Sequence, residues 1–464
     1  MKKKNGLDNL LLKTDSYKFS HHVQYPKGTE KVYSYFESRT GAKFRDTVFF
    51  GLQAFLKRYL EGQVVTQEKL DEAKAIAEAH VGAGIFNYDG WKYILDTYNG
   101  YLPIKIKAVP EGTPVSVSNV LMTIENTDPK CFWLTNYLET LLVQVWYPCT
   151  VATQSREAKK IILKYLKETG DPAGVDFKLH DFGYRGVSSD ESAGMGAMAH
   201  LVNFLGTDTV AGLMYAREYY GANMAGFSIP ASEHSTITSW GKDHEVDAYE
   251  NMLDSYPKGL VACVSDSWDI YNACKNLWGG KLRDKVLKRE GTLVVRPDSG
   301  DPIETVPAVL KTLGEAFGYT VNEKGYLVLP PQVAVIQGDG INFESIPKIL
   351  QAVEKAGWST QNIAFGSGGG LLQMLNRDTQ RFAFKCSQVV VNGQEREVYK
   401  SPVTDPTKNS KKGKLVLTKD RVMDAWVTKE AGTTTEVDQL QTVFENGKIV
   451  KEYTWDEVKA NAKI

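Results

Sequence analysis

The chain has 464 residues, of which 42% are hydrophobic and 24% are charged. These proportions are those of folded globular proteins, and they exclude a disordered, collagen-like or coiled-coil chain. The 55 basic and 56 acidic residues leave a net charge of -1. A chain with this balance has no global positive field that would attract nucleic acid or an anionic membrane surface. We therefore expect neither as a partner.

The cysteines and the apolar segments indicate where the protein works. Five cysteines are widely spaced and form no C-x-x-C pair, a pattern that favours a reducing compartment, so we expect a cytoplasmic protein. Only residues 10–12 are apolar after the basic start, too few for a signal peptide. The most apolar stretch, residues 131–148, contains polar side chains and falls short of the roughly 20 residues that a bilayer requires. We expect no membrane span.

The N-terminal third mixes strand and helix patterns. Residues 32–36 and 104–109 have the composition of strands, and residues 67–80 that of an exposed helix. Leucines and valines at helical spacing over residues 134–145 predict one buried helix, with Asp128-Pro129 ahead of it as cap and first-turn proline. This part of the chain therefore reads as α+β.

From about residue 175, apolar runs alternate with amphipathic helical segments. Four runs are clear, at residues 260–264, 293–295, 333–336 and 363–365, and each ends in a polar or glycine-rich turn. Continuous Val/Ile runs are typical of parallel strands that are buried on both faces. The pattern predicts an α/β protein with an irregular β/α barrel over residues 146–384. Residues 1–145 and 385–464 are predicted to build a second, α+β domain.

Acidic and glycine-rich residues follow the predicted strands, where barrel enzymes carry their chemistry. Asp266, Asp298 and Asp339 each follow a different strand, beside Arg296, which suggests Mg²⁺ held mainly through substrate oxygens. The alternative is that each aspartate is a helix N-cap. Residues 366–370 could present backbone amides to a phosphate, or could form a tight turn that needs positive φ.

Two further segments carry reactive or aromatic side chains. His234 follows Glu233 just past a strand end, where it could be a functional group or a satisfied structural histidine. The run over residues 180–186 combines aromatic rings with a guanidinium, which suits a flat ring beside phosphate, although core packing explains it equally well.

These motifs, in this order, resemble the nicotinamide phosphoribosyltransferase family from about residue 10 to near the C-terminus. The strings that carry the resemblance are residues 14–18, 24–26, 180–189, 206–209, 233–236, 296–300 and 366–370. The resemblance implies transfer of phosphoribosyl from phosphoribosyl pyrophosphate to nicotinamide, with Mg²⁺, giving nicotinamide mononucleotide and pyrophosphate for NAD biosynthesis or salvage. It also implies a homodimer with both active sites at the subunit boundary.

The resemblance also implies a role for individual side chains. Phe182, with Arg185 alongside, would stack on nicotinamide from one side and Tyr17 of the partner subunit from the other, while Asp208 would accept the amide. The other substrate-binding positions that it implies, several of them reaching phosphates across the dimer, are Asp15, Arg39, Arg296, Asp298, Gly338, Asp339, Gly368, Gly369, Arg377, Lys385 and Lys408.

Family members also use ATP to phosphorylate a histidine, which the resemblance places at His234, with Asp266 and Glu233 as its supports. The implied catalytic residues are these three and Asp298, and the implied metal-binding residues are Asp266 and Asp298, through water or substrate oxygens. Two alternatives remain at this point. The chain could act on nicotinate or quinolinate instead, or it could be a non-catalytic binding protein that keeps the fold.

Overall fold

The computed structural model describes residues 6–404, 409–420, 422 and 424–464. Contacts divide the chain into two compact units. The antiparallel unit holds the chain up to Thr153, Glu218–Ala222 and Asn376–Lys463, and the barrel unit holds Gln154–Arg217, Asn223–Leu375 and Ile464. The predicted domain limits at residues 145 and 384 fall beside the start of α6 (Trp146–Thr169) and inside β13 (Ala383–Val391).

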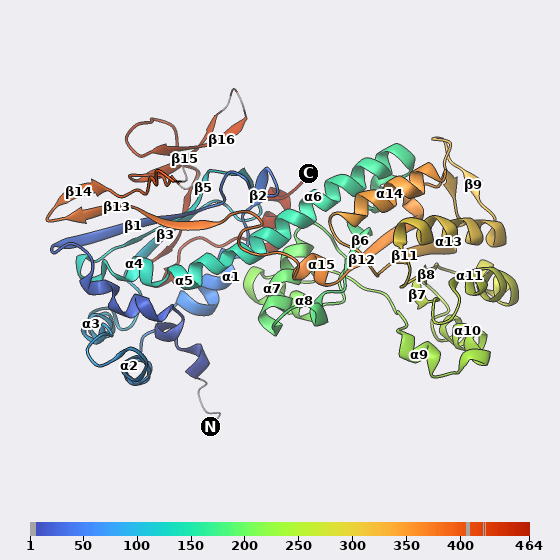
Figure 1. The fold of residues 1–464 in the computed structure, drawn as a ribbon, viewed down its shortest axis with the longest axis horizontal. Helices are drawn as coiled ribbons and strands as arrows, with labels where there is room; N and C mark the ends of the chain where they lie inside the picture. Colours follow the sequence, from blue (N-terminus) through green and yellow to red (C-terminus); the bar gives the residue numbers. More distant parts are fainter. Residues whose placement is uncertain (1–5, 405–408, 421, 423) are drawn as a thin grey trace. The chain divides into compact units, whose positions relative to one another are not determined.

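A seven-stranded sheet forms the antiparallel unit, in the order β14-β13-β1-β5-β3-β17-β18 (Figure 1). The long strand β1 lies inside the sheet, where it pairs antiparallel with both β13 and β5. The predicted strands at residues 32–36 and 104–109 are confirmed within β1 and β3. The strands are β1 (Thr29–Glu37), β3 (Ile104–Ala108), β5 (Val120–Asn126), β13, β14 (Gln394–Glu397), β17 (Gln441–Glu445) and β18 (Lys448–Ile449).

Helices and two small sheets complete this unit. The helix predicted over residues 67–80 is confirmed as α2 (Gln67–Val81). The single helix predicted over residues 134–145 is wrong, because Leu138, with a ψ of -7°, separates two short helices. The remaining elements include α1 (Leu52–Phe55), α3 (Tyr88–Tyr98), α4 (Leu134–Tyr137), α5 (Glu139–Leu142), α16 (Trp455–Asn461), and the pairs β2 (Asp46–Val48) with β4 (Pro114–Ser116) and β15 (Leu415–Asp420) with β16 (Ala425–Glu430).

The barrel unit contains five parallel strands in the order β6-β12-β11-β8-β7. Three isolated parallel bridges, Asp181 to Thr207, Gly206 to Phe227 and Ala231 to Ala262, join the two edges of this sheet. The ring is therefore closed, and the predicted irregular β/α barrel is confirmed. Its strands are β6 (Leu179–Asp181), β7 (Val261–Val264), β8 (Leu293–Arg296), β11 (Val333–Gln337) and β12 (Ile363–Ser367).

Helices accompany the barrel strands, as the alternating pattern predicts (Figure 1). α13 contacts both β11 and α14. Within the described residues, no helix has the length and apolar character needed to cross a bilayer. The main helices of this unit are α6 from Gln154 onward, α7 (Asp190–Leu201), α8 (Val210–Tyr220) as far as Arg217, α9 (His234–Thr238), α10 (Glu245–Ser255), α13 (Pro302–Phe317), α14 (Ser345–Lys355) and α15 (Gly369–Leu372).

Alternate residues of the barrel strands share one apolar cluster. Ala262, Val294 and Ile336 pack together with Phe182 and Ile229, which come from the other side of the ring. Only the interior face of a closed ring brings these side chains into one cluster. Since side chains alternate along a strand, the next inward positions toward the C-terminal ends are Arg296, Gly338 and Gly366.

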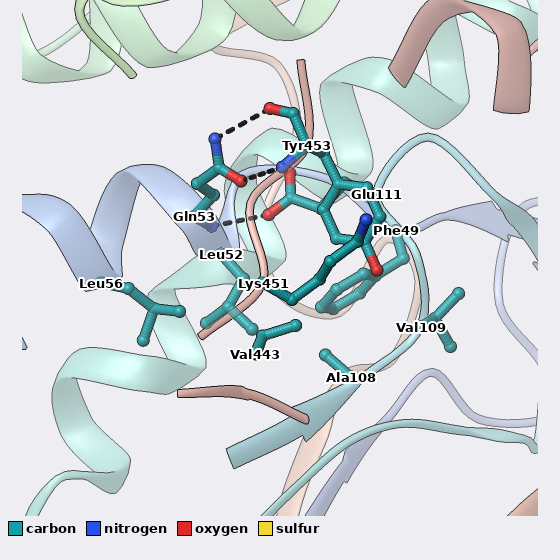
Figure 2. Close-up of a pocket in the computed structure, with 10 residues that line it drawn as sticks. All are labelled: Phe49, Leu52, Gln53, Leu56, Ala108, Val109, Glu111, Val443, Lys451 and Tyr453. Carbon is teal, nitrogen blue, oxygen red and sulfur yellow. Dashed lines mark hydrogen bonds between the residues drawn. The ribbon is translucent and has the colours of Figure 1, made fainter. Parts of the chain in front are cut away.

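A buried carboxylate organises the core of the antiparallel unit. Glu111 lies beside a small cavity, where the backbone N–H of Gln53 donates to its Oε1 at 2.6 Å (Figure 2). Its Oε2 accepts from the Gly51 N–H at 2.8 Å and from the Tyr220 hydroxyl at 2.5 Å. Burial raises the pKa of Glu111, although these three hydrogen bonds act to lower it. The side chain of Gln53 in turn bonds both backbone groups of Tyr453.

We predict that Glu111→Gln destabilises the protein, because a carboxamide has one acceptor oxygen and turns an NH₂ group toward one of the three donors. An unpaired buried donor costs about 1–3 kcal/mol, so the apparent Tm should fall by at least about 2 °C. Glu452→Gln is the matched control, since the Glu452 carboxylate is exposed and pairs with Lys57. Equal melting of the two variants would contradict the assignment.

Candidate active site

The candidate site lies at the C-terminal ends of the barrel strands, where Phe182 sits among glycines. The Phe182 N–H donates to the carbonyl of Ser367 at 2.9 Å, which fixes the residue beside β12. A Cβ on Gly366 would lie 1.9 Å from the Phe182 ring, and a Cβ on Gly338 would lie 2.7 Å from Oδ1 of Asp298. These two glycines therefore make room for an aromatic ring and a carboxylate inside the barrel mouth.

Asp208 faces the same mouth and is held by two donors. Nε2 of His180 lies 2.8 Å from its Oδ1, and the Ser228 hydroxyl donates to the same oxygen at 2.5 Å. The His180 ring also contacts the Phe182 ring, with 5.1 Å between the ring centroids. Burial acts to raise the pKa of Asp208, but hydrogen bonds from His180 and Ser228 and the charge of Arg296 outweigh it, so the pKa is lowered. Asp208 is thus an ionised acceptor near the ring.

His234 begins α9 and faces a buried carboxylate. Its Nε2 lies 3.0 Å from Oδ1 of Asp266, and the Ser299 hydroxyl donates to the other oxygen of that aspartate at 2.5 Å. Glu233, which the resemblance implies as a second support, is the N-cap residue of α9 and its carboxylate accepts from the Ser235 hydroxyl. The structure therefore places Asp266, and not Glu233, in contact with the imidazole.

Arg296 and Asp298 form the charged floor of the mouth. The Arg296 Nε lies 3.8 Å from Oδ1 of Asp298, and this buried N–H has no hydrogen-bond partner within the described residues. Burial raises the pKa of Asp298; the charge of Arg296 opposes the shift, and the nearby carboxylates of Asp266 and Asp339 add to it. An unpaired guanidinium N–H beside clustered carboxylates suits a ligand that carries both anionic oxygens and a cation.

The glycine-rich segment after β12 does not need glycine for a left-handed turn, because none of residues 366–370 has positive φ. The alternative of a tight turn that requires positive φ is therefore wrong. A Cβ on Gly370 would lie 2.6 Å from the Ile341 carbonyl, which explains that glycine by packing. At Gly368 and Gly369 the nearest atoms would be 3.5 and 3.9 Å away. Packing therefore does not explain why glycine occupies positions 368 and 369. These residues lie at the start of α15, where the first backbone N–H groups have no acceptor within the helix.

The antiparallel unit carries a second group of predicted residues. Tyr17 is 58% exposed and its ring contacts that of His21, while Asp15 accepts from the Thr140 hydroxyl at 2.8 Å. Burial lowers the pKa of Lys385; Glu139 opposes this, and the charges of Arg39, Lys400 and Arg377 add to it. The cations thus cluster, as phosphate binding requires. Lys408 lies outside the described residues.

For two predicted positions, Arg185 and Asp339, the described residues show no side-chain partner that defines a role. Arg185 is exposed in the turn Tyr184–Gly186, and Asp339 is exposed after β11, with its carbonyl accepting from Gln337 at 2.9 Å. The sequence did not single out Ser228 or Lys400, and it gave no separate role to His180 and Ser299, which lie within the segments 180–186 and 296–300. His180 could have been found, because it precedes Phe182 by two residues and so shares its strand face; the others become visible only in three dimensions.

Mg²⁺ has no ready-made protein site here. Among the residues that the structure describes, no group of three or more His, Cys, Asp or Glu side chains is placed to hold a metal ion. The carboxylate of Asp266 nevertheless helps to raise the pKa of Asp298, and a cation shared with substrate oxygens would relieve this repulsion. The residues fit a magnesium ion that arrives with the substrate, since Mg²⁺ is usually held by few carboxylates plus phosphate oxygens.

Comparisons with known proteins agree over nearly the whole chain. Residues 177–448 match the family model of nicotinate phosphoribosyltransferase, and residues 9–106 match the nicotinamide phosphoribosyltransferase N-terminal domain. The chain is 52% identical to nicotinamide phosphoribosyltransferase of Xanthomonas campestris pv. campestris (strain 8004), over 98% of each chain. It is 36% identical to the enzyme of that name from Acinetobacter baylyi, over 97% of this chain and 96% of the relative.

Two solved structures share the fold. The nicotinate-nucleotide pyrophosphorylase from Pyrococcus furiosus matches with a TM-score of 0.62 and 17% identity, covering 100% of this chain and 97% of that one. Human nicotinic acid phosphoribosyltransferase matches with a TM-score of 0.55 and 14% identity, covering 97% and 92%. The fold and the near-full-length relatives agree: the chain belongs to the nicotinamide phosphoribosyltransferase family, a family of transferases.

Proposed function

We propose that the protein transfers the phosphoribosyl group of phosphoribosyl pyrophosphate to nicotinamide in NAD biosynthesis, coupled to ATP hydrolysis through a phosphohistidine. The relatives at 52% and 36% identity support the substrates. The observation that carries the choice of nicotinamide is Asp208, an acceptor whose pKa is lowered and which the His180 ring links to Phe182.

The reaction needs no general base at the nucleophile, because the ring nitrogen of nicotinamide carries a free lone pair. This nitrogen forms a bond to the anomeric carbon while the bond from that carbon to pyrophosphate breaks, and the leaving oxygen keeps the electron pair. Positive charge builds on the ribose in the transition state, where the carboxylates of Asp298 and Asp266 stabilise it. Phe182 orients the ring, and Arg296 with its unpaired Nε–H neutralises phosphate charge.

Mg²⁺, bound through substrate oxygens beside Asp266 and Asp298, would supply Lewis-acid stabilisation of the leaving pyrophosphate. The chain's own contribution is to hold these carboxylates close. Asp298 is fixed where only glycine fits at residue 338, since a Cβ there would lie 2.7 Å from its Oδ1. Asp266 is fixed by Ser299 and His234.

The proposed ATP coupling uses His234. Its Nε2 is bonded to Asp266, so Nδ1 is the ring nitrogen with a free lone pair when Nε2 carries the proton. Nδ1 would attack the terminal phosphorus of ATP, forming an N–P bond while the bond to ADP breaks. Asp266, held by Ser299 on its other oxygen, would stabilise the imidazolium character that develops, as the third member of an activated nucleophile does.

We also propose a homodimer with shared sites. The Tyr17 ring is 58% exposed and is available to cover the second face of a nicotinamide ring held by Phe182 of the other subunit, since aromatic stacking uses both faces. The cations around Lys385 would then serve the phosphates. Purified protein supplied with nicotinamide, phosphoribosyl pyrophosphate and Mg²⁺ should form nicotinamide mononucleotide, detected by mass; absence of this product would reject the proposed activity.

We predict that Asp208→Asn and Asp208→Ser raise kcat/KM for nicotinate relative to nicotinamide. An ionised carboxylate accepts an amide N–H but repels a substrate carboxylate, and a hydrogen bond to a charged group contributes about 1.5–3 kcal/mol, so the ratio should shift at least tenfold. If Asp208 only capped the helix that starts near Thr209, the substitutions would lower stability and leave the ratio of the two kcat/KM values unchanged. A ratio unchanged in both variants would refute the specificity role.

We predict that Gly366→Ala raises KM for nicotinamide by roughly tenfold or more, because the new methyl group would lie 1.9 Å from the Phe182 ring and must displace it. Steady-state kinetics with both substrates measures the effect. Gly174→Ala is the matched control, since its Cβ would meet nothing closer than 3.9 Å. If both variants keep the wild-type KM, Phe182 is not the stacking residue.

We predict that His234→Ala abolishes ATP hydrolysis but leaves slow product formation that does not respond to ATP. The wild-type enzyme assayed without ATP is the reference, and the variant should match its rate and its KM for phosphoribosyl pyrophosphate. Complete loss of product in a folded variant would count against a purely coupling role for His234.

A further inference from the structure

Both donors that hold Asp208 bind the same oxygen atom. Nε2 of His180 and the hydroxyl of Ser228 lie 2.8 and 2.5 Å from Oδ1, whereas Oδ2 takes part in no hydrogen bond within the described residues. One carboxylate oxygen is therefore saturated and the other is left as the acceptor. Because a carboxylate can rotate about its last torsion, two donors on one oxygen select one orientation.

The His180 donor is itself held from inside the barrel. The His180 side chain is 14% exposed while that of Asp208 is 47% exposed, so the histidine lies beneath the carboxylate. A Cβ on Gly206 would come within 2.7 Å of Nδ1 of His180, and the Phe182 ring lies on another side at a centroid distance of 5.1 Å. With so little room, the imidazole cannot move away and its Nε2 stays aimed at Asp208.

We propose that His180 and Ser228 are positioning residues that fix Asp208 so that Oδ2 accepts the carboxamide N–H of nicotinamide and cannot turn away from a competing carboxylate. The inference rests on the proposed function and deepens it. A charge alone does not guarantee discrimination, because a mobile Asp208 could rotate or take another rotamer when nicotinate binds. Two hydrogen bonds to a charged acceptor make that escape costly.

Two variants separate the charge of Asp208 from its orientation. His180→Leu and Ser228→Ala keep the Asp208 carboxylate but remove the donors that aim it. We expect each single variant to raise the kcat/KM ratio of nicotinate to nicotinamide several-fold, and the double variant to raise it roughly tenfold or more, the scale expected for hydrogen bonds to a charged group. His180→Gln and Ser228→Thr retain a donor and should recover part of the wild-type ratio.

The control variant is His244→Ala. His244 also pairs with an aspartate, through Nδ1 at 2.7 Å from Asp247, but on the exposed surface, so its substrate ratio should equal that of wild type. Thermal melting of each variant checks folding, and Ser228→Ala alters an exposed residue, which keeps the test usable if the His180 variants are unstable.

The outcomes distinguish this inference from the proposed function. If Asp208→Asn shifts the ratio and Ser228→Ala and the double variant do not, positioning is refuted while the role of Asp208 stands. If wild type forms no nicotinamide mononucleotide, the proposed function itself fails. A lowered Tm with an unchanged ratio would show that His180 is only structural, and a raised ratio with rescue by the conservative variants supports the inference.

Discussion

The buried carboxylate of Asp181 ties the edge strand β6 to residues 207–208, the first of the segments through which the barrel closes. One of its oxygens accepts from the Gly183 N–H at 2.7 Å and the other from the Thr207 hydroxyl at 2.8 Å. Its backbone carbonyl accepts from the Asp208 N–H at 2.9 Å. Burial raises the pKa of Asp181 against these hydrogen bonds. Asp181 thereby holds together β6, the turn that follows β6 and the segment that carries Asp208.

This constraint decides which side chains reach the site. Since side chains alternate along a strand, fixing Asp181 toward Thr207 sends its two neighbours, His180 and Phe182, to the inner face. A register slip of one residue would exchange these faces and leave no aromatic ring in the mouth. The parallel pairing of β6 with β12 then sets His180 opposite Gly366, where the missing side chain leaves space for the Phe182 ring. The inward position of the Phe182 ring and the need for glycine at residue 366 therefore both follow from the pairing register of β6 and β12.

Much of this arrangement could be predicted from the sequence, because strands buried on both faces leave a continuous apolar pattern and their C-terminal ends are marked by Asp266, Asp298 and glycine. The roles of Gly366 and Ser228 could not, since they depend on atoms far away in the chain. The break in the helix over residues 134–145 also escaped prediction, because apolar periodicity is the same on either side of Leu138. The resemblance implied Glu233 as a support of His234, but at the N-cap of α9 its carboxylate faces Ser235.

The two acids at the mouth are pushed in opposite directions, and this division matches the chemistry that the site must perform. Hydrogen bonds from His180 and Ser228, with the charge of Arg296, lower the pKa of Asp208 despite burial; burial and the carboxylates of Asp266 and Asp339 raise the pKa of Asp298 despite Arg296. A carboxylate whose charge is stabilised by two hydrogen-bond donors and a nearby guanidinium is a stable acceptor for an amide. One that shares its surroundings with like charges is poised for a cation or a developing positive charge, which is the usual sign that two acids have different roles. The same barrel mouth can thus recognise a neutral ring at one side and stabilise the transferred ribose at the other.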